Sequence, residues 1–161
     1  GDIIHRWIPP SRRATAAIFH SLASLTAAGK AELHEGFEQL TEYLAKPSLI
    51  VAVSDWMEDP ARWGKSLESL ATYRHDIRAL HLYSAKEWAF DLPENIRLFA
   101  KEGQEDIPLE PSSIRDDFLL EVRRYKNEVS EWAARSKAIW SYAALEDSLL
   151  LPLLRLIQGE R

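Results

Sequence analysis

Three carboxylates, Asp55, Glu58 and Asp59, lie within five positions of one another, directly after an apolar run at residues 49–53. Carboxylate oxygens are preferred ligands of hard cations such as Mg²⁺, although one carboxylate with waters binds Mg²⁺ only weakly. The alternative role is structural. Asp55 can accept hydrogen bonds from backbone N–H groups of the following loop, and Asp59 can stand at a helix N-terminus, where the helix dipole favours negative charge.

A metal-assisted hydrolase that uses Asp55, Glu58 and His75 is one hypothesis for these side chains. His75 with Asp76 could form a general base and its orienting carboxylate. Neighbouring side chains on a strand point to opposite faces, however, so these two groups cannot face each other and are better interpreted as the start of a strand. The sequence contains no Gly-x-Ser-x-Gly elbow, no glycine-rich phosphate loop and no cysteine. It therefore holds no complete catalytic constellation of a familiar kind.

Composition favours one globular domain over residues 1–161, with 46% hydrophobic and 28% charged residues. A net charge of −5 argues against a nucleic-acid partner, which needs a basic surface. No apolar run approaches the roughly 20 residues of a membrane span, so we expect no membrane contact by this segment. The absence of cysteine fits a cytoplasmic location.

The run at residues 49–53 predicts a central strand covered on both faces, as in a parallel sheet, and ligands of such sheets bind at the carboxyl ends of the strands. Apolar segments predict further strands at residues 3–8, 77–83, 96–100, 107–109 and 139–145.

Helical spacing predicts five helices between these strands. The first begins at the cap Ser11 and ends at Gly29, and the second covers residues 33–44. The third opens at Asp59-Pro60. The longest starts near Ser113, and the last is capped by Asp147. Alternation of strands and helices predicts a Rossmann-like α/β fold with a mostly parallel sheet flanked by helices.

Two tryptophans, Trp56 and Trp88, follow the ends of predicted strands. Partly exposed aromatic residues often anchor protein contacts, so both are candidate interaction residues together with Asp55, Glu58 and Asp59. The alternative is that the two rings pack over the upper edge of the sheet.

The chain resembles the von Willebrand factor A-like domain of bacterial proteins called "domain of unknown function 58". Four segments carry the resemblance: Ile8-Pro9-Pro10-Ser11-Arg12-Arg13, residues 49–59, residues 74–82, and Tyr125 with residues 138–145, 149–156 and Arg161. The resemblance covers nearly the whole chain but only the C-terminal part of the family's domain. It implies an N-terminally truncated von Willebrand A-like domain.

The resemblance also implies a function. Such proteins are taken to act as binding partners of MoxR-type AAA+ ATPases and not as enzymes, so we expect a protein-interaction module without a cofactor. Complete von Willebrand A domains often bind a divalent cation, and Asp55 matches one ligand position. Ala31 stands where the family has a threonine ligand, Ser84 stands where an aspartate is common, and the Asp-x-Ser-x-Ser loop is absent. Any Mg²⁺ site at Asp55 is therefore incomplete and weak.

Truncation would leave the strand at residues 49–53 without one of its neighbours. An apolar strand with a free edge associates readily. We therefore expect that this edge pairs with a second copy, or that the copies exchange an element, which makes a purely structural dimerisation domain another hypothesis. The alternative is that residues 3–8 fill the vacant place.

Overall fold

The computed structural model describes residues 8–9, 11–26, 32–91, 97–99, 106–108 and 111–159, with the backbone alone for 97–99, 106–108 and 111. Most of the strand predicted at residues 3–8, as well as Gly29, Ala31 and Arg161, lies outside these ranges. In the ranges that the structure describes, no helix is long and apolar enough to cross a membrane.

A parallel three-stranded sheet forms the centre of the fold. Its strands are β1 (Leu49–Ser54), β2 (Asp76–Tyr83) and β5 (Ile139–Ala144), in the order β1-β2-β5. Ser54 stands opposite His81 in the β1–β2 register, and Tyr83 stands opposite Ala144 in the β2–β5 register. All three strands therefore end at the same edge of the sheet, which confirms the predicted mixed α/β architecture.

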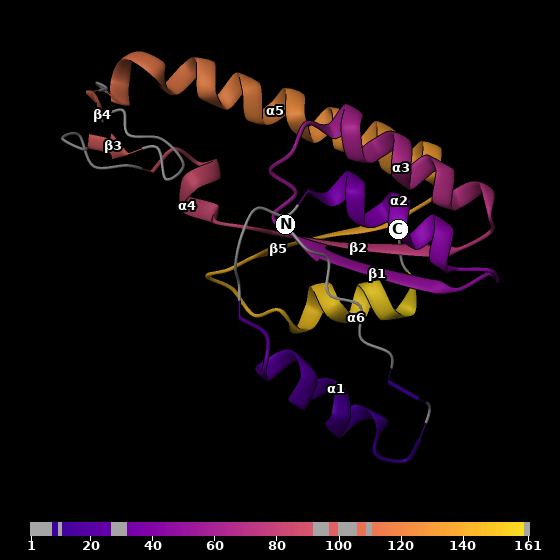
Figure 1. Cartoon of the computed structure of the whole chain (residues 1–161). Coiled ribbons are helices and arrows are strands. Elements are labelled where there is room, and N and C mark those ends of the chain that lie inside the picture. Colours follow the sequence, from indigo (N-terminus) through magenta and orange to yellow (C-terminus); the bar gives the residue numbers. More distant parts are fainter. Residues whose placement is uncertain are drawn as a thin grey trace.

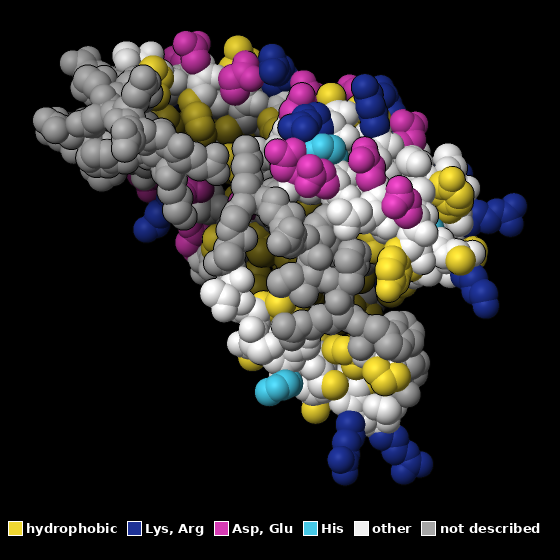
Figure 2. Space-filling view, in the orientation of Figure 1, with side chains coloured by type: hydrophobic (Ala, Val, Ile, Leu, Met, Phe, Trp, Pro, Cys, Tyr) yellow, Lys and Arg dark blue, Asp and Glu magenta, His cyan; other side chains and the backbone are white. Residues whose placement is uncertain are grey.

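Helices cover the two faces of this sheet unequally (Figure 1). One face carries α2 (Leu33–Tyr43), α3 (Pro60–Thr72) and α5 (Pro111–Ser136), and the other carries α6 (Leu150–Gln158). The helix α1 (Ala14–Ala23) lies beyond α6 and has no buried residue. Figure 2 shows hydrophobic side chains on the surface over α1.

The larger part of the core lies between the sheet and α2, α3 and α5. The buried face of α3 consists of Trp63, Leu67 and Leu70, which are each 0% exposed. The indole of Trp63 stacks on Trp140 of β5 with 5.4 Å between ring centroids. A smaller cluster on the other face joins Leu80, Ala143 and Leu156 of β2, β5 and α6.

The interpretation of the run at residues 49–53 as a doubly covered central strand was wrong. Among the described strands β1 pairs with β2 alone, so it forms an edge of the sheet. Ile50 packs in the core, whereas Leu49, Val51 and Val53 are 58%, 52% and 56% exposed. Their side chains point to the face that α6 covers, but among the described elements α6 packs mainly on β2 and β5.

Several predicted helix starts were also displaced. The helix α1 begins at Ala14, because Ser11 accepts from the N–H of Arg13 in a turn before it. The longest helix begins at Pro111, a residue suited to the first helical position, so Ser113 lies inside it. The last helix begins at Leu150, after a turn that joins Asp147 N–H to the Ala144 carbonyl, and Asp147 does not cap it.

Two short elements follow β2. The segment after Tyr83, expected to be irregular, contains the single-turn helix α4 (Ala85–Trp88), and the side chain of Ser84 caps it. The strands β3 (Arg97–Phe99) and β4 (Asp106–Pro108) lie where the sequence predicts strands at residues 96–100 and 107–109, and they pair antiparallel. They lie beside the N-terminal end of α5 (Figure 1).

Candidate functional site

The loop between β1 and α3 leaves the sheet at the carboxyl ends of the strands. Trp56 in this loop adopts a φ of 55°, a left-handed conformation that is uncommon for a bulky residue. Its indole is 0% exposed, and Nε1 donates a hydrogen bond to the Leu80 carbonyl at 3.1 Å. The hydroxyl of Tyr125 donates to the Trp56 carbonyl at 2.6 Å. Trp56 is therefore a core residue, and its prediction as an exposed contact residue was wrong.

Asp55 is exposed and stabilises the same loop. Its Oδ1 accepts hydrogen bonds from the Met57 N–H at 3.3 Å and from the Ser54 hydroxyl at 3.4 Å. These contacts correspond to the structural alternative for this carboxylate. Across the described ranges, the side chains close enough together to hold a metal ion are Glu32, His34 and Glu35, and Asp55 is not among them. A cation ligand at Asp55 stays a prediction.

Asp59 and Pro60 begin α3 as the sequence predicts. The Asp59 carboxylate accepts from the Ala61 N–H at 2.9 Å, and Pro60 occupies the first helical turn. Such a cap satisfies one of the four N–H groups that have no partner within a helix. Asp59 thus holds the loop end and also presents its charge at the surface.

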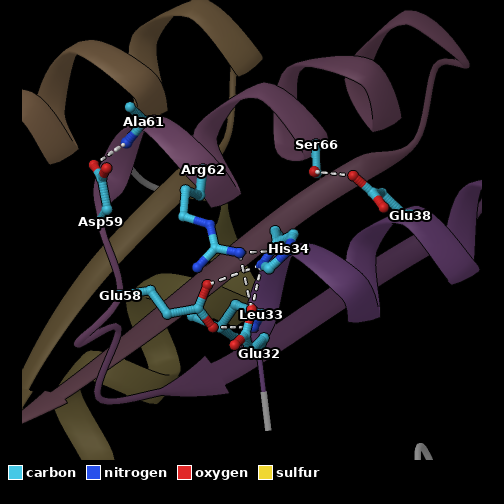
Figure 3. A network of polar contacts seen from close by, with 9 residues as sticks. All are labelled: Glu32, Leu33, His34, Glu38, Glu58, Asp59, Ala61, Arg62 and Ser66. Carbon is cyan, nitrogen blue, oxygen red and sulfur yellow. Dashed lines mark hydrogen bonds and ion pairs between the residues drawn. The ribbon is translucent and has the colours of Figure 1, made fainter.

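Glu58 joins the loop to the start of α2 through a polar network (Figure 3). One carboxylate oxygen accepts from the Leu33 N–H, and the other lies 3.2 Å from His34 Nδ1. Arg62 places one guanidinium nitrogen 3.0 Å from Glu32 and 3.1 Å from His34 Nε2. Arginine can only donate, so His34 Nε2 accepts and Nδ1 carries the proton that faces Glu58.

The same network determines the charge of the group formed by Glu32, His34 and Glu35. The guanidinium of Arg62 supplies the positive charge that balances Glu32. Figure 2 shows acidic side chains gathered around a histidine on this side of the molecule. The network therefore ties α2, the β1–α3 loop and α3 together.

A groove of about 810 Å³ lies beside the loop. One wall is a face of α5, formed by Ile114, Phe118, Val122 and Tyr125. The opposite side consists of α4 and the β1–α3 loop, with the apolar residues Met57, Pro60, Trp88 and Phe90. Phe90 and Phe118 meet across the groove with 5.0 Å between ring centroids. A pocket of this size falls in the range of ligand-binding sites.

Acidic side chains surround this apolar floor. The lining includes five carboxylates, those of Glu58, Asp59, Glu87, Glu121 and Glu128. Among the described lining residues one cation is present, Arg124, and its guanidinium lies 3.4 Å from Glu121 and 3.6 Å from Glu128. The groove therefore combines an apolar interior with a negative rim.

Trp88 lines the groove and is half-buried, in agreement with its predicted partial exposure. Its ring stacks on Tyr83 at 4.0 Å, and the Lys126 ammonium lies 4.1 Å from its centroid. The short helix that carries Trp88 is held by Glu146, which accepts from the Ser84 hydroxyl at 2.6 Å and from the Ala85 N–H at 3.0 Å. The hydrogen bond from Ser84 is the main reason that the pKa of Glu146 falls to about 2.

His81 lies beneath the site among aromatic rings. It is 1% exposed, and its neighbours within about 6 Å are Trp88, Tyr125, Trp140 and Tyr142. Burial lowers the pKa of His81 to about 4, an effect that the charge of Asp55 partly opposes and that of Lys126 reinforces. Its Nδ1 has no hydrogen-bond partner among the described residues. His81 is therefore neutral near pH 7.

The two tyrosines around His81 resist ionisation. Burial raises the pKa of Tyr142 to about 12 and raises that of Tyr125 as well. Both hydroxyls stay protonated near neutral pH. The Tyr125 hydroxyl is thereby kept as a hydrogen-bond donor to the loop.

His75 lies far from these groups. It precedes Asp76, which stands opposite Leu49 at the start of β1, whereas Asp55 follows the end of β1. Parallel strands rise about 3.3 Å per residue, so His75 lies about 23 Å from Asp55 along the strand direction. Its Nδ1 accepts from the Ser48 N–H at 3.1 Å, as expected for a residue at the start of a strand. The structure thus does not bring Asp55, Glu58 and His75 together for hydrolysis.

Sequence reasoning found Glu58, Asp59 and Trp88 of the groove but missed its α5 wall. The spacing of Ile114, Phe118, Val122 and Tyr125 predicts an apolar helix stripe. That spacing is the only sequence signal of the groove, and it is equally typical of a core. A scan against models of protein families gave no match, and searches of curated proteins and of solved structures gave no significant match either.

Proposed function

We propose that this chain is a non-enzymatic protein-interaction module, a von Willebrand A-like domain that acts in the cytoplasm as the partner of a MoxR-type AAA+ ATPase. The groove between α5, α4 and the β1–α3 loop is the contact surface. The observation that carries the proposal is this apolar groove beside the carboxyl ends of the strands, where ligands of parallel sheets bind.

Three of the residues first chosen as contacts support this assignment. Glu58 and Asp59 lie on the rim, and Trp88 lies on the apolar side. Aromatic side chains in partly open pockets are typical anchors of protein interfaces. Asp55 contributes by shaping the loop through its bond to Met57, which itself lines the groove.

Binding of the purified MoxR-type AAA+ ATPase to the full chain tests the proposal, with biolayer interferometry as the measurement. Phe118→Ala removes an apolar group from the groove, and we expect it to weaken binding about tenfold, as loss of an interface anchor does. Leu120→Ala is the matched control, because Leu120 is an exposed apolar residue on α5 outside the groove lining. Equal loss for both variants, or no binding by the wild type, contradicts the proposal.

Self-association through β1 is a second candidate role, because a specific feature favours it. The strand has one partner among the described strands, and Leu49, Val51 and Val53 expose an apolar row. The edge sequence Leu49–Ser54 contains no charge and no proline, the usual protections against edge pairing.

Sedimentation velocity over a range of concentrations tests this role. We expect a reversible dimer of the wild type, and a monomer for Val51→Lys, because a charged side chain on an edge strand, lysine above all, opposes edge pairing. Tyr43→Lys, at an exposed residue of α2, is the control and should still dimerise. A wild-type monomer at every concentration would contradict self-association.

A further inference from the structure

We propose that the groove between α5, α4 and the β1–α3 loop receives a basic amphipathic α-helix of the partner protein. This inference deepens the proposed function and rests on it for the identity of the partner. It follows from three properties of the groove: the backbone that forms its walls, the spacing of its apolar side chains and the charge on its rim.

The walls favour a helix over an extended peptide. An extended peptide binds by adding to a free strand edge, where its backbone finds hydrogen-bond partners. The principal wall here is the side of α5, whose backbone groups are bonded within the helix. An extended segment in the groove would leave the N–H and C=O groups that face the α5 wall without partners, whereas a helix satisfies its backbone groups internally.

The apolar residues of α5 have the spacing of a helix-packing ridge. Ile114, Phe118 and Val122 recur every four residues, which is the row that interdigitates when two helices pack. From Ile114 to Tyr125 the wall measures about 17 Å, or about three helical turns. A partner helix with apolar residues at i, i+4, i+7 and i+11 matches this length.

The charge of the rim determines which sign of charge the partner helix should carry. Among the lining residues that the structure describes, Glu87, Glu121 and Glu128 join Glu58 and Asp59 to give five carboxylates against the guanidinium of Arg124, a balance of −4. Glu58 and Asp59 already accept hydrogen bonds within the chain, and Glu121 and Glu128 share the guanidinium of Arg124. These three side chains of α5 keep a net charge of −1, and Glu87 adds an exposed carboxylate on α4. Lysines or arginines beside the apolar stripe of a helix would complement this rim.

Synthetic peptides of about five helical turns serve as probes in fluorescence polarisation with the full chain. The first has leucines on one face and lysines beside them. The second replaces every lysine with glutamate, and the third has the composition of the first with leucines spread around the helix. We expect the first peptide to bind at least about tenfold more tightly than the other two. Only this peptide combines an apolar face that fits the apolar row of α5 with positive charges that fit the acidic rim of the groove. Equal binding of the acidic peptide overturns the inference.

Charge-reversal variants locate the binding. Glu121→Lys with Glu128→Lys should weaken binding of the basic peptide about tenfold or more, since two attractive charges become repulsive. Glu131→Lys is the matched control, because Glu131 is an exposed residue of the same helix in a similar ion pair with Arg135, outside the groove. Equal weakening by the control shows unspecific attraction and overturns the inference.

The two proposals fail separately. If the ATPase binds and Phe118→Ala weakens it, while the basic peptide shows no preference or no dependence on Glu121 and Glu128, the function stands and the basic-helix inference falls. If the ATPase does not bind, while the basic peptide shows the expected preference and the expected loss in the charge-reversal variant, the assigned partner falls and the groove still accepts a basic helix.

Discussion

The hydroxyl of Tyr125 donates a hydrogen bond of 2.6 Å to the backbone carbonyl of Trp56. This contact fixes the middle of α5 to the one loop residue whose backbone is left-handed and whose ring is fully buried. It joins the wall of the groove to the carboxyl end of β1. The position of the groove therefore depends on a core contact.

Removal of this hydroxyl in Tyr125→Phe should destabilise the fold by about 1–2 kcal/mol, because the Trp56 carbonyl loses a donor in a partly buried place. Urea denaturation measures the change in the free energy of unfolding. Tyr73→Phe, at an exposed tyrosine, is the control and should change stability very little. A Tyr125→Phe variant as stable as the wild type would show that water replaces the hydroxyl.

The buried His81 should make the stability depend on pH. Its pKa is about 4 in the folded chain and 6.5 in the unfolded chain, so the unfolded state binds more protons between these values. Stability therefore falls as the pH decreases from about 6.5 towards 4. This group alone accounts for about 2 kcal/mol between pH about 7 and pH about 5.

The variant His81→Leu isolates this effect. The loss of unfolding free energy between pH about 7 and pH about 5 should be smaller in the variant than in the wild type by about 2 kcal/mol. His20→Gln changes an exposed histidine and should leave the wild-type pH dependence in place. Identical pH profiles for wild type and His81→Leu would mean that His81 is protonated in the folded chain.

The close approach of α3 to α5 at Gly64 should make the fold sensitive to any side chain at this position. A Cβ atom at this position of α3 would overlap the indole ring of Trp132 on α5. We expect Gly64→Ala to destabilise the fold by about 1–3 kcal/mol, as overpacking does in a tight interior. Gly36→Ala on α2 meets open space and should leave stability unchanged or raise it. Thermal unfolding followed by circular dichroism compares the two.

The Glu58 network should hold the first turn of α2. In Glu58→Ala the Leu33 N–H loses its acceptor and His34 loses a partner, so we expect a destabilisation of about 1–2 kcal/mol. Hydrogen exchange should accelerate at Leu33. Glu35→Ala, at an exposed residue of the same helix, should leave the exchange of Leu33 unchanged. Slow exchange at Leu33 in both variants would contradict this role.

The fold was predictable where a local rule decided the structure. Pro60 and Asp59 have strong preferences at a helix start, and the spacing of Trp63, Leu67 and Leu70 specifies one buried face. The strand at residues 49–53 was predictable as a strand but not as an edge. An unbroken apolar run is the same whether one or both faces are covered, because burial depends on what the rest of the chain places beside it.

The candidate site was harder to predict because its parts are distant in sequence. Glu58 meets Leu33 and His34, which lie 25 and 24 residues away, and no spacing rule connects them. The stripe of α5 shows a further limit. Val129 is fully buried against the core, whereas Phe118 on the same stripe stays 36% exposed in the groove wall. Periodicity identifies the apolar stripe of α5. Only the packing of the helix decides which part of the stripe enters the core and which part lines the groove.

The indoles of Trp56, Trp63 and Trp140 lie within 5.4 Å of one another, centroid to centroid, on the inner face of the sheet. Chromophores at such separations share their excited states, so the folded chain should give a strong near-ultraviolet dichroism signal and quenched, blue-shifted emission. Both signals would disappear as soon as the rings separate. The protein thus carries a built-in optical reporter of whether the β1–α3 loop, α3 and β5 are assembled.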